Sequence, residues 1–161
     1  MEEHNKDMQE IERKYLIDNE SWRKDVVRSM RIAQGYLCSR RVTARVRMCD
    51  DRGILTIKGK SRDGGVSRFE WEREIPHKAA EHLLQRCKGV VDKVRHIVEY
   101  EGHTFEVDEF KGDNEGLIIA EVELSSRSEI VALPPWCGDE VTGVRCFYNS
   151  FLSKHPFRSW R

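Results

Sequence analysis

Apolar and charged residues alternate with a period of two over most of this sequence, as in Ala120-Glu121-Val122-Glu123. Because successive side chains of a strand point to opposite faces, the pattern predicts strands with one apolar and one charged face. The expected strands cover residues 9–18, 30–38, 42–50, 53–60, 66–75, 91–101, 103–111 and 117–125.

Turn-forming residues separate several of the expected strands, at Asp50-Asp51-Arg52-Gly53, Asp63-Gly64-Gly65 and Glu101-Gly102. Short connections of this kind join antiparallel neighbours. We therefore expect an antiparallel sheet, and about eight strands are enough to close a sheet into a barrel.

Helical spacing interrupts the alternation most clearly after Pro76, where apolar residues from Ala79 to Cys87 recur at helical intervals. Gly89 stands where this helix would end. Two further candidate helices are at residues 145–154 and, more weakly, 20–28. Residues 1–8 are expected to fray.

The composition excludes several classes of protein. The 161 residues contain 28 basic and 28 acidic side chains, and this balance argues against a nucleic-acid partner bound through global positive charge. With 39% hydrophobic residues, one domain spanning residues 1–161 can bury a core.

The N-terminus does not resemble a signal peptide and no stretch is long enough to span a membrane, so a cytoplasmic location without a membrane partner is expected. Five cysteines without a Cys-x-x-Cys pair predict reduced thiols.

The charged faces of the expected strands carry eight cations and nine carboxylates, with few uncharged polar residues. The cations are Lys14, Arg45, Arg47, Lys58, Lys60, Arg68, Lys93 and Arg95, and the carboxylates are Glu10, Glu12, Glu70, Glu72, Glu74, Glu106, Asp108, Glu121 and Glu123. One interpretation is an open sheet whose charged face meets water, with weak cross-strand ion pairs. A merely wet face would normally mix Ser, Thr, Asn and Gln among its charges.

Pairs of like charges two residues apart favour a second interpretation. Neighbouring carboxylates repel one another, and a divalent cation such as Mg²⁺, which prefers oxygen ligands, relieves that repulsion. Paired basic residues have a matching ligand, because arginine forks and lysine ammonium groups fit phosphate oxygens. If the strands close into a barrel, both sets line one passage, and the implied ligand is a metal-bound oligophosphate.

Nine short motifs in order resemble those of the CYTH, or triphosphate tunnel metalloenzyme, superfamily. They are Glu10-Ile11-Glu12-Arg13-Lys14, Gln34-Gly35-Tyr36-Leu37, Arg45-Val46-Arg47, Leu55-Thr56-Ile57-Lys58, Ser67-Arg68 with Glu70 and Glu72, Lys93-Val94-Arg95, Glu106-Val107-Asp108, Ala120-Glu121-Val122-Glu123 and Glu140-Val141-Thr142. The resemblance implies an α+β fold, a closed eight-stranded antiparallel β-barrel that forms a tunnel, with a few flanking helices. The chain departs from the family pattern at Cys146-Phe147, where relatives usually show an Arg-Tyr pair.

By position, the resemblance also implies roles for individual residues. The implied metal is Mg²⁺ or Mn²⁺, with two ions in the active complex. These ions would be held by Glu10, Glu12, Asp108, Glu121 and Glu123. Phosphates would be bound by Lys14, Arg45, Arg47, Lys58, Arg68, Lys93 and Arg95. Tyr36, assisted by Lys14, is the implied general base, and Glu10 or Glu12 is the alternative.

Among the proteins of this family, the chain is most similar to compact bacterial inorganic triphosphatases, which hydrolyse tripolyphosphate to pyrophosphate and phosphate. The expected partner is therefore a small-molecule triphosphate, and the resemblance is compatible with a homodimer. Three alternatives stay open at this point: an adenylate cyclase of the class IV type, a thiamine or nucleoside triphosphatase, and a module that binds polyphosphate without cleaving it.

Overall fold

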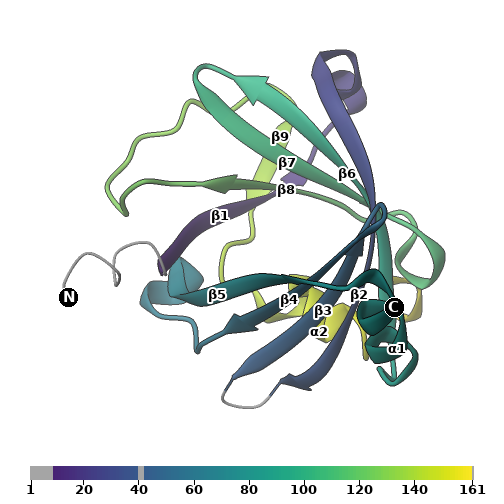
Figure 1. Cartoon of the computed structure of the whole chain (residues 1–161). Helices are drawn as coiled ribbons and strands as arrows, with labels where there is room; N and C mark the ends of the chain where they lie inside the picture. Colours follow the sequence, from purple (N-terminus) through teal and green to yellow (C-terminus); the bar gives the residue numbers. More distant parts are fainter. Residues whose placement is uncertain (1–8, 40–41, 161) are drawn as a thin grey trace.

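The computed structural model describes residues 9–39 and 42–160, and within them eight antiparallel strands form a closed barrel (Figure 1). The strands are β1 (Gln9–Ile17), β2 (Val26–Ser39), β3 (Thr43–Cys49), β4 (Arg52–Lys58), β5 (Ser67–Ile75), β6 (Val90–Tyr100), β7 (His103–Phe110) and β8 (Ile118–Glu123). Their order is β5-β4-β3-β2-β6-β7-β8-β1, and pairing of β1 with β5 closes the ring. The predicted fold is confirmed.

The closure of the barrel depends on a short segment of β1. Gln9, Glu10 and Ile11 pair with β5, and the following residues of β1 pair with β8 from Glu12 to Leu16. We call the pairing of β1 with β5 the seam of the barrel. A ninth strand, β9 (Cys137–Glu140), pairs with the end of β1 beyond this seam. The sequence analysis did not predict β9, because its four residues show no alternation.

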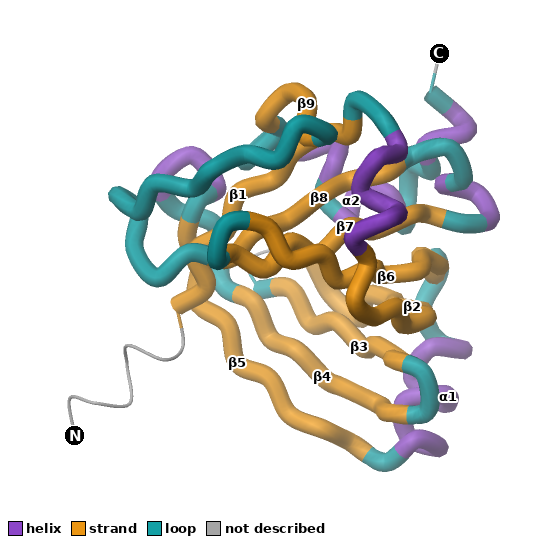
Figure 2. Tube along the Cα trace, turned by 90° about the horizontal axis from the view of Figure 1, so that it is seen from above, coloured by secondary structure: helices purple, strands orange, loops and turns teal. Residues whose placement is uncertain are grey.

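The helical segments are shorter than predicted, except for one. The helix α1 (His77–Gln85) follows Pro76 as expected and packs against β3 and β4 (Figure 2). Residues 20–28, predicted as a weak helix, instead contain the 3₁₀ turn η2 (Glu20–Asp25) and the beginning of β2. The predicted helix at residues 145–154 is reduced to the 3₁₀ turn η5 (Arg145–Phe147) and the single α-turn α2 (Asn149–Leu152). Short 3₁₀ turns also occur as η3 (Asp63–Gly65), η4 (Gly112–Asn114) and η6 (Phe157–Ser159).

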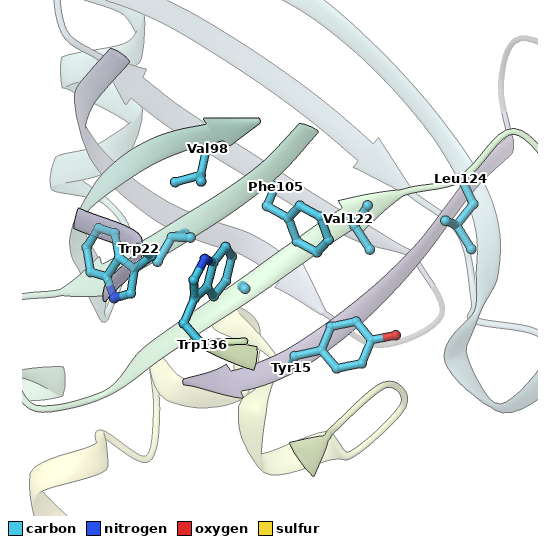
Figure 3. Close-up of a cluster of buried hydrophobic side chains, with 9 residues drawn as sticks. Tyr15, Trp22, Val98, Phe105, Val122, Leu124 and Trp136 are labelled. Atoms are coloured by element: carbon cyan, nitrogen blue, oxygen red, sulfur yellow. The ribbon is translucent and has the colours of Figure 1, made fainter. Parts of the chain in front are cut away.

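The main hydrophobic core lies on the outer side of the barrel wall. Because the charged residues of β1, β7 and β8 point into the barrel, the alternate residues of these strands point outward. Trp22 of η2 and Trp136 of the loop before β9 cover this outer face (Figure 3). The buried members of the cluster are Tyr15, Trp22, Val98, Phe105, Val107, Ala120, Val122, Leu124 and Trp136.

A second apolar cluster fills part of the barrel interior. Val91, Phe110 and Ile119 share the inward faces of their strands with charged residues, and they pack with Leu117 and with Leu152 of α2. The interior therefore changes from charged to apolar along its length, and α2 packs at the apolar part. The apolar face of β5 is covered incompletely, since Phe69 is 45% exposed.

Two further features concern the expectations from composition. No helix in the described part of the chain is long and apolar enough to cross a membrane. Cys49, Cys87, Cys137 and Cys146 carry free thiols, as predicted. The predicted fraying of residues 1–8 and the side chain of Cys38 lie outside the described residues.

Candidate functional site

A cavity of about 920 Å³ occupies the barrel interior, and its wall is strongly charged. All of the predicted site residues except Asp108 line this cavity. Its basic members are Lys14, Arg45, Arg47, Lys58, Arg68, Lys93 and Arg95, and its acidic members are Glu10, Glu12, Glu70, Glu72, Glu106, Glu121, Glu123 and Glu129. Closure of the barrel thus brings together charged residues as far apart in the sequence as Glu10 and Glu129.

The arginines of β3 form the basic wall and have few anionic partners. Arg45 Nη2 donates to Thr56 Oγ1 at 3.2 Å, whereas its Nε is buried with no hydrogen-bond partner in the described residues. Arg47 donates through Nε and Nη2 to Gln34 Oε1, at 3.2 and 3.1 Å. Burial, together with the charges of Arg45 and Arg95, lowers the pKa of Arg47 to about 10. These guanidinium groups therefore lie in a site that favours an added anion.

Asp108 lies behind the basic wall and holds two of its cations. Its carboxylate accepts hydrogen bonds from Arg95 Nε at 2.7 Å and Nη2 at 2.8 Å, and from Lys93 Nζ at 2.5 Å. Only 1% of the Asp108 side chain is exposed. Burial alone would raise the pKa of Asp108, but Arg95 and Lys93 lower it. Burial lowers the pKa of Lys93 to about 7 although Asp108 opposes the shift.

The carboxylates of β1 and β8 form the acidic wall. Glu12 is directly opposite Glu123 in the strand register, and Lys14 is directly opposite Glu121. Burial first, and then the charge of Glu121, raises the pKa of Glu12. Burial and the charge of Glu10 likewise raise the pKa of Glu123. The acidic wall therefore favours an added cation.

Glu121 differs from its neighbours because basic residues surround it. Its carboxylate is 3.3 Å from Lys14 Nζ and 3.9 Å from Arg95 Nη2. Burial would raise the pKa of Glu121, but Lys14, Arg95 and Lys93 lower it well below the ordinary value. Glu121 thus stays ionised at the boundary between the acidic and basic walls.

Ion pairs also connect the two walls across the seam. Glu10 Oε2 is 2.7 Å from Lys58 Nζ and 3.9 Å from Arg68 Nε, and Arg68 also reaches Glu12 at 3.9 Å. The carboxylates and cations therefore face one another inside a single cavity, which excludes the alternative of an open charged surface that merely meets water.

The donor chemistry of the acidic wall fits a hard divalent cation. Within residues 9–39 and 42–160, no three His, Cys, Asp or Glu side chains are grouped closely enough to hold a metal by themselves. Mg²⁺ is usually held by only one or two carboxylates, with waters and substrate phosphates completing its shell. Glu10, Glu12, Glu121 and Glu123 supply oxygen ligands of this type.

Residues after β9 fix the backbone at Lys14, the lysine of the first motif. The backbone N–H of Lys14 donates to Thr142 Oγ1 at 3.0 Å, and the N–H of Val141 donates to the Lys14 carbonyl at 2.8 Å. Thr142 in turn donates to Glu140 at 2.8 Å. The Glu140-Val141-Thr142 motif therefore positions the segment of β1 that carries Lys14.

The sequence analysis missed Tyr148 as a residue of the cavity wall and placed more weight on Tyr36. Tyr36 lines the cavity and accepts a hydrogen bond from Gln34 Nε2 at 2.7 Å, and burial raises its pKa although Arg45 and Arg47 oppose the shift. The ammonium group of Lys14 lies over the ring of Tyr148, 5.3 Å from its centre. Position in the sequence gave one signal for Tyr148, since it directly follows Cys146-Phe147, where the chain departs from the family pattern.

Comparison with known proteins agrees with the charged cavity described above. The family model described as CYTH domain matches residues 8–148. A protein of Acetivibrio thermocellus named inorganic triphosphatase is 40% identical over 155 residues, which cover 94% of this chain and 97% of that protein. An inorganic triphosphatase of Nitrosomonas europaea is 32% identical over 152 residues, with coverage of 91% and 97%.

Solved structures show the same fold. The crystal structure of an inorganic triphosphatase superposes with a TM-score of 0.63 at 29% identity, covering 89% of this chain and 93% of that chain. A Hippeastrum protein, whose description pairs adenylyl cyclase with a dominant triphosphatase activity, superposes with a TM-score of 0.59 at 17% identity, covering 73% and 80%.

Proposed function

The chain belongs to the CYTH domain family, and we propose that it is a divalent-metal-dependent triphosphatase that hydrolyses inorganic tripolyphosphate to pyrophosphate and phosphate. The observation that carries this proposal is the pair Arg45 and Arg47: both side chains line one cavity together with the carboxylates, and Arg45 is buried with its Nε unpaired in the described residues. A chain of phosphates neutralises such a basic wall, and its metal ions neutralise the acidic wall. Two relatives named inorganic triphosphatase share 40% and 32% of their residues with this chain.

The basic residues hold the phosphates in this account. Arg45 and Arg47 present guanidinium forks that can each contact two phosphate oxygens, and Arg95 can offer the N–H groups that Asp108 does not occupy. Lys58 acts as a point charge, and so does Lys93 once an adjacent phosphate favours its ionised form. Asp108 keeps Lys93 and Arg95 in place from behind, and we assign it this supporting role in preference to metal binding. The same cations stabilise negative charge that develops as the phosphoanhydride bond breaks.

Glu10, Glu12, Glu121 and Glu123 would hold Mg²⁺ or Mn²⁺, with two ions in the active complex. The metal, when bound, supplies charge neutralisation on the phosphate oxygens and acidifies water. Ion pairs that now join Glu10 to Lys58 and Glu121 to Lys14 would be exchanged for contacts with metal and phosphate.

The attacking water needs a base within the cavity. Tyr36 is one candidate, but burial raises the pKa of its hydroxyl, which leaves little phenolate at neutral pH. Glu10 and Glu12 are ionisable carboxylates on the acidic wall, and we propose that one of them accepts the proton of the water. Tyr36 then acts as a neutral donor toward a phosphate oxygen.

The test is a phosphate-release assay with tripolyphosphate, ATP and thiamine triphosphate, each with Mg²⁺ and with Mn²⁺. We expect the highest turnover with tripolyphosphate, with one phosphate and one pyrophosphate formed for each molecule consumed. Cyclic nucleotide formation from ATP without phosphate release would instead identify a cyclase. Tight binding of tripolyphosphate without turnover in either metal would identify a binding module.

A further inference from the structure

Tyr148 contacts two cations that come from different strands. Its ring centre is 5.3 Å from Lys14 Nζ and 5.5 Å from Arg68 Cζ, and its side chain lines the cavity. Lys14 belongs to β1 and Arg68 to β5, the two strands that close the barrel. An aromatic face attracts cations through its quadrupole, and the attraction is larger where water is excluded. One ring thus serves two cations at the seam.

Tyr148 lies between the beginning of α2 and the turn of η3. At the backbone end, the Tyr148 carbonyl accepts from the N–H groups of Phe151 and Leu152, both at 2.9 Å, which begins α2. At the hydroxyl end, the ring reaches the turn of η3. A Cβ built on Gly65 would lie 3.0 Å from the Tyr148 hydroxyl and 2.5 Å from the Cα of Gly143. Both glycines have positive φ, a conformation that glycine adopts readily. The two turns and the tyrosine fit together only because neither glycine carries a side chain.

Lys14 and Arg68 share one carboxylate partner, Glu12, and each has a second one, Glu121 for Lys14 at 3.3 Å and Glu10 for Arg68 at 3.9 Å. Lys14 is 3.6 Å from Glu12, and Arg68 is 3.9 Å from the same carboxylate. Ion pairs at 3.3–3.9 Å fix the distance of each cation from its carboxylates only loosely, and both cations can move toward their common partner Glu12. The ring of Tyr148 supplies a second, uncharged contact that does not compete with phosphate for hydrogen bonds.

We propose that Tyr148 is a positioning residue that fixes Lys14 and Arg68 for the reaction through the face of its ring. The proposal rests on the proposed function of the cavity and extends it to a residue that supplies neither a ligand atom nor a proton. A misplacement of about 1 Å in a group that contacts the transition state can lower the rate on the order of a hundredfold. The ring, and not the hydroxyl, is the part that matters.

The experiment compares Tyr148→Phe, which keeps the ring, with Tyr148→Leu, which removes it. With tripolyphosphate and Mg²⁺, we expect Tyr148→Phe to keep kcat within about threefold of the wild type, and Tyr148→Leu to lose about tenfold or more, which corresponds to two cation–π contacts. KM should change less than kcat, because Arg45, Arg47 and Arg95 still bind the substrate.

Phe147→Leu is the matched control. Phe147 precedes Tyr148, stacks edge-on against Trp160 and packs against the interior apolar cluster, without lining the cavity. The Phe147→Leu variant should have a lower melting temperature than the wild type and a kcat within about twofold of the wild-type value. If Tyr148→Leu keeps the wild-type kcat, or if Tyr148→Phe loses as much as Tyr148→Leu, the ring is not the positioning element and the proposal is wrong.

Crystal structures of the wild type and of Tyr148→Leu separate this proposal from the proposed function. In the leucine variant, we expect Lys14 Nζ and Arg68 Cζ to move toward Glu12 by about 1 Å or more, a displacement that would matter for catalysis. This readout does not depend on turnover, so it decides the positioning role even if the wild type hydrolyses no triphosphate. Unchanged positions of both groups would overturn the proposal.

Discussion

Arg47 donates through Nε and Nη2 to one acceptor in the cavity, the side-chain carbonyl of Gln34. A neutral amide positions the guanidinium without neutralising it, so the positive charge is kept for a ligand. Gln34 itself is fully buried and also donates to Tyr36. This arrangement favours ligand binding over stability, because burial and repulsion by Arg45 lower the pKa of Arg47.

Replacement of Arg47 by Met should therefore separate activity from stability. We expect kcat/KM for tripolyphosphate to fall at least about a hundredfold, since one buried charge-assisted phosphate contact is lost. The melting temperature of the ligand-free protein should change little, because removal of a charge repelled by its neighbours offsets the loss of two hydrogen bonds to the buried Gln34. Arg52→Met, at an exposed position of β4, is the control and should keep wild-type activity. Equal activity of the two variants would contradict the assignment of Arg47.

Glu12→Gln should abolish turnover and leave the fold intact. Burial and Glu121 already raise the pKa of Glu12, so loss of its charge relieves repulsion within the acidic wall. We expect turnover to fall at least about a thousandfold, while circular dichroism and the melting temperature stay near wild-type values. Glu115→Gln, which affects only the exposed pair with Arg158, is the matched control. Turnover at the wild-type rate in Glu12→Gln would remove Glu12 from the site.

Asp108→Asn should act on stability first. It leaves the buried cations Lys93 and Arg95 without their common carboxylate, a change of about 3–5 kcal/mol in the free energy of unfolding. Denaturant unfolding measures this loss, and Lys93→Met added to Asp108→Asn should recover part of it. Titration with Mn²⁺ tests the supporting role separately. Unchanged Mn²⁺ affinity in a folded Asp108→Asn protein supports it, and loss of Mn²⁺ binding would return Asp108 to the metal ligands.

Glu109 should make stability depend on pH in acid. Hydrogen bonds from Arg23, Lys111 and His96 lower its pKa from 4.5 to about 2. Because the folded value is the lower one, the stabilisation is complete above pH 4.5 and is lost as the pH falls toward 2. The wild type should exceed Glu109→Gln in unfolding free energy by about 1–3 kcal/mol at pH 6, and the gap should shrink below about pH 4.5 and close only below about pH 2. A gap that does not change with pH would show that Glu109 does not carry the effect.

The strand pattern predicted most of the fold because each strand separates its two faces by alternation. The same rule placed Arg45 and Glu121 on inward faces, so the two charged walls followed once the barrel closed. Alternation says nothing of depth, however, and Asp108 therefore shares the inward face of β7 but lies behind Lys93 and Arg95. The sequence-based metal assignment of Asp108 could not include that detail.

Features that depend on contacts between distant loops were beyond the sequence pattern. Tyr148 lines the cavity at a place where the turns at Gly65 and Gly143 meet beside its hydroxyl. The strand β9 forms because Glu140 and Cys137 pair with β1, and its own four residues carry no periodic signal. The expected helix at residues 145–154 failed for a similar reason, since the contacts of Tyr148 and Leu152 with the barrel divide it into two short turns.

The most direct test of this account is a crystal structure of Glu12→Gln with tripolyphosphate, a variant expected to bind without turnover. The account predicts a phosphate chain inside the barrel, with oxygens of different phosphates contacting Arg45, Arg47 and Arg95. Tripolyphosphate bound only outside the barrel, or a cavity without it at millimolar concentrations, would contradict the central claim that the two charged walls enclose a triphosphate.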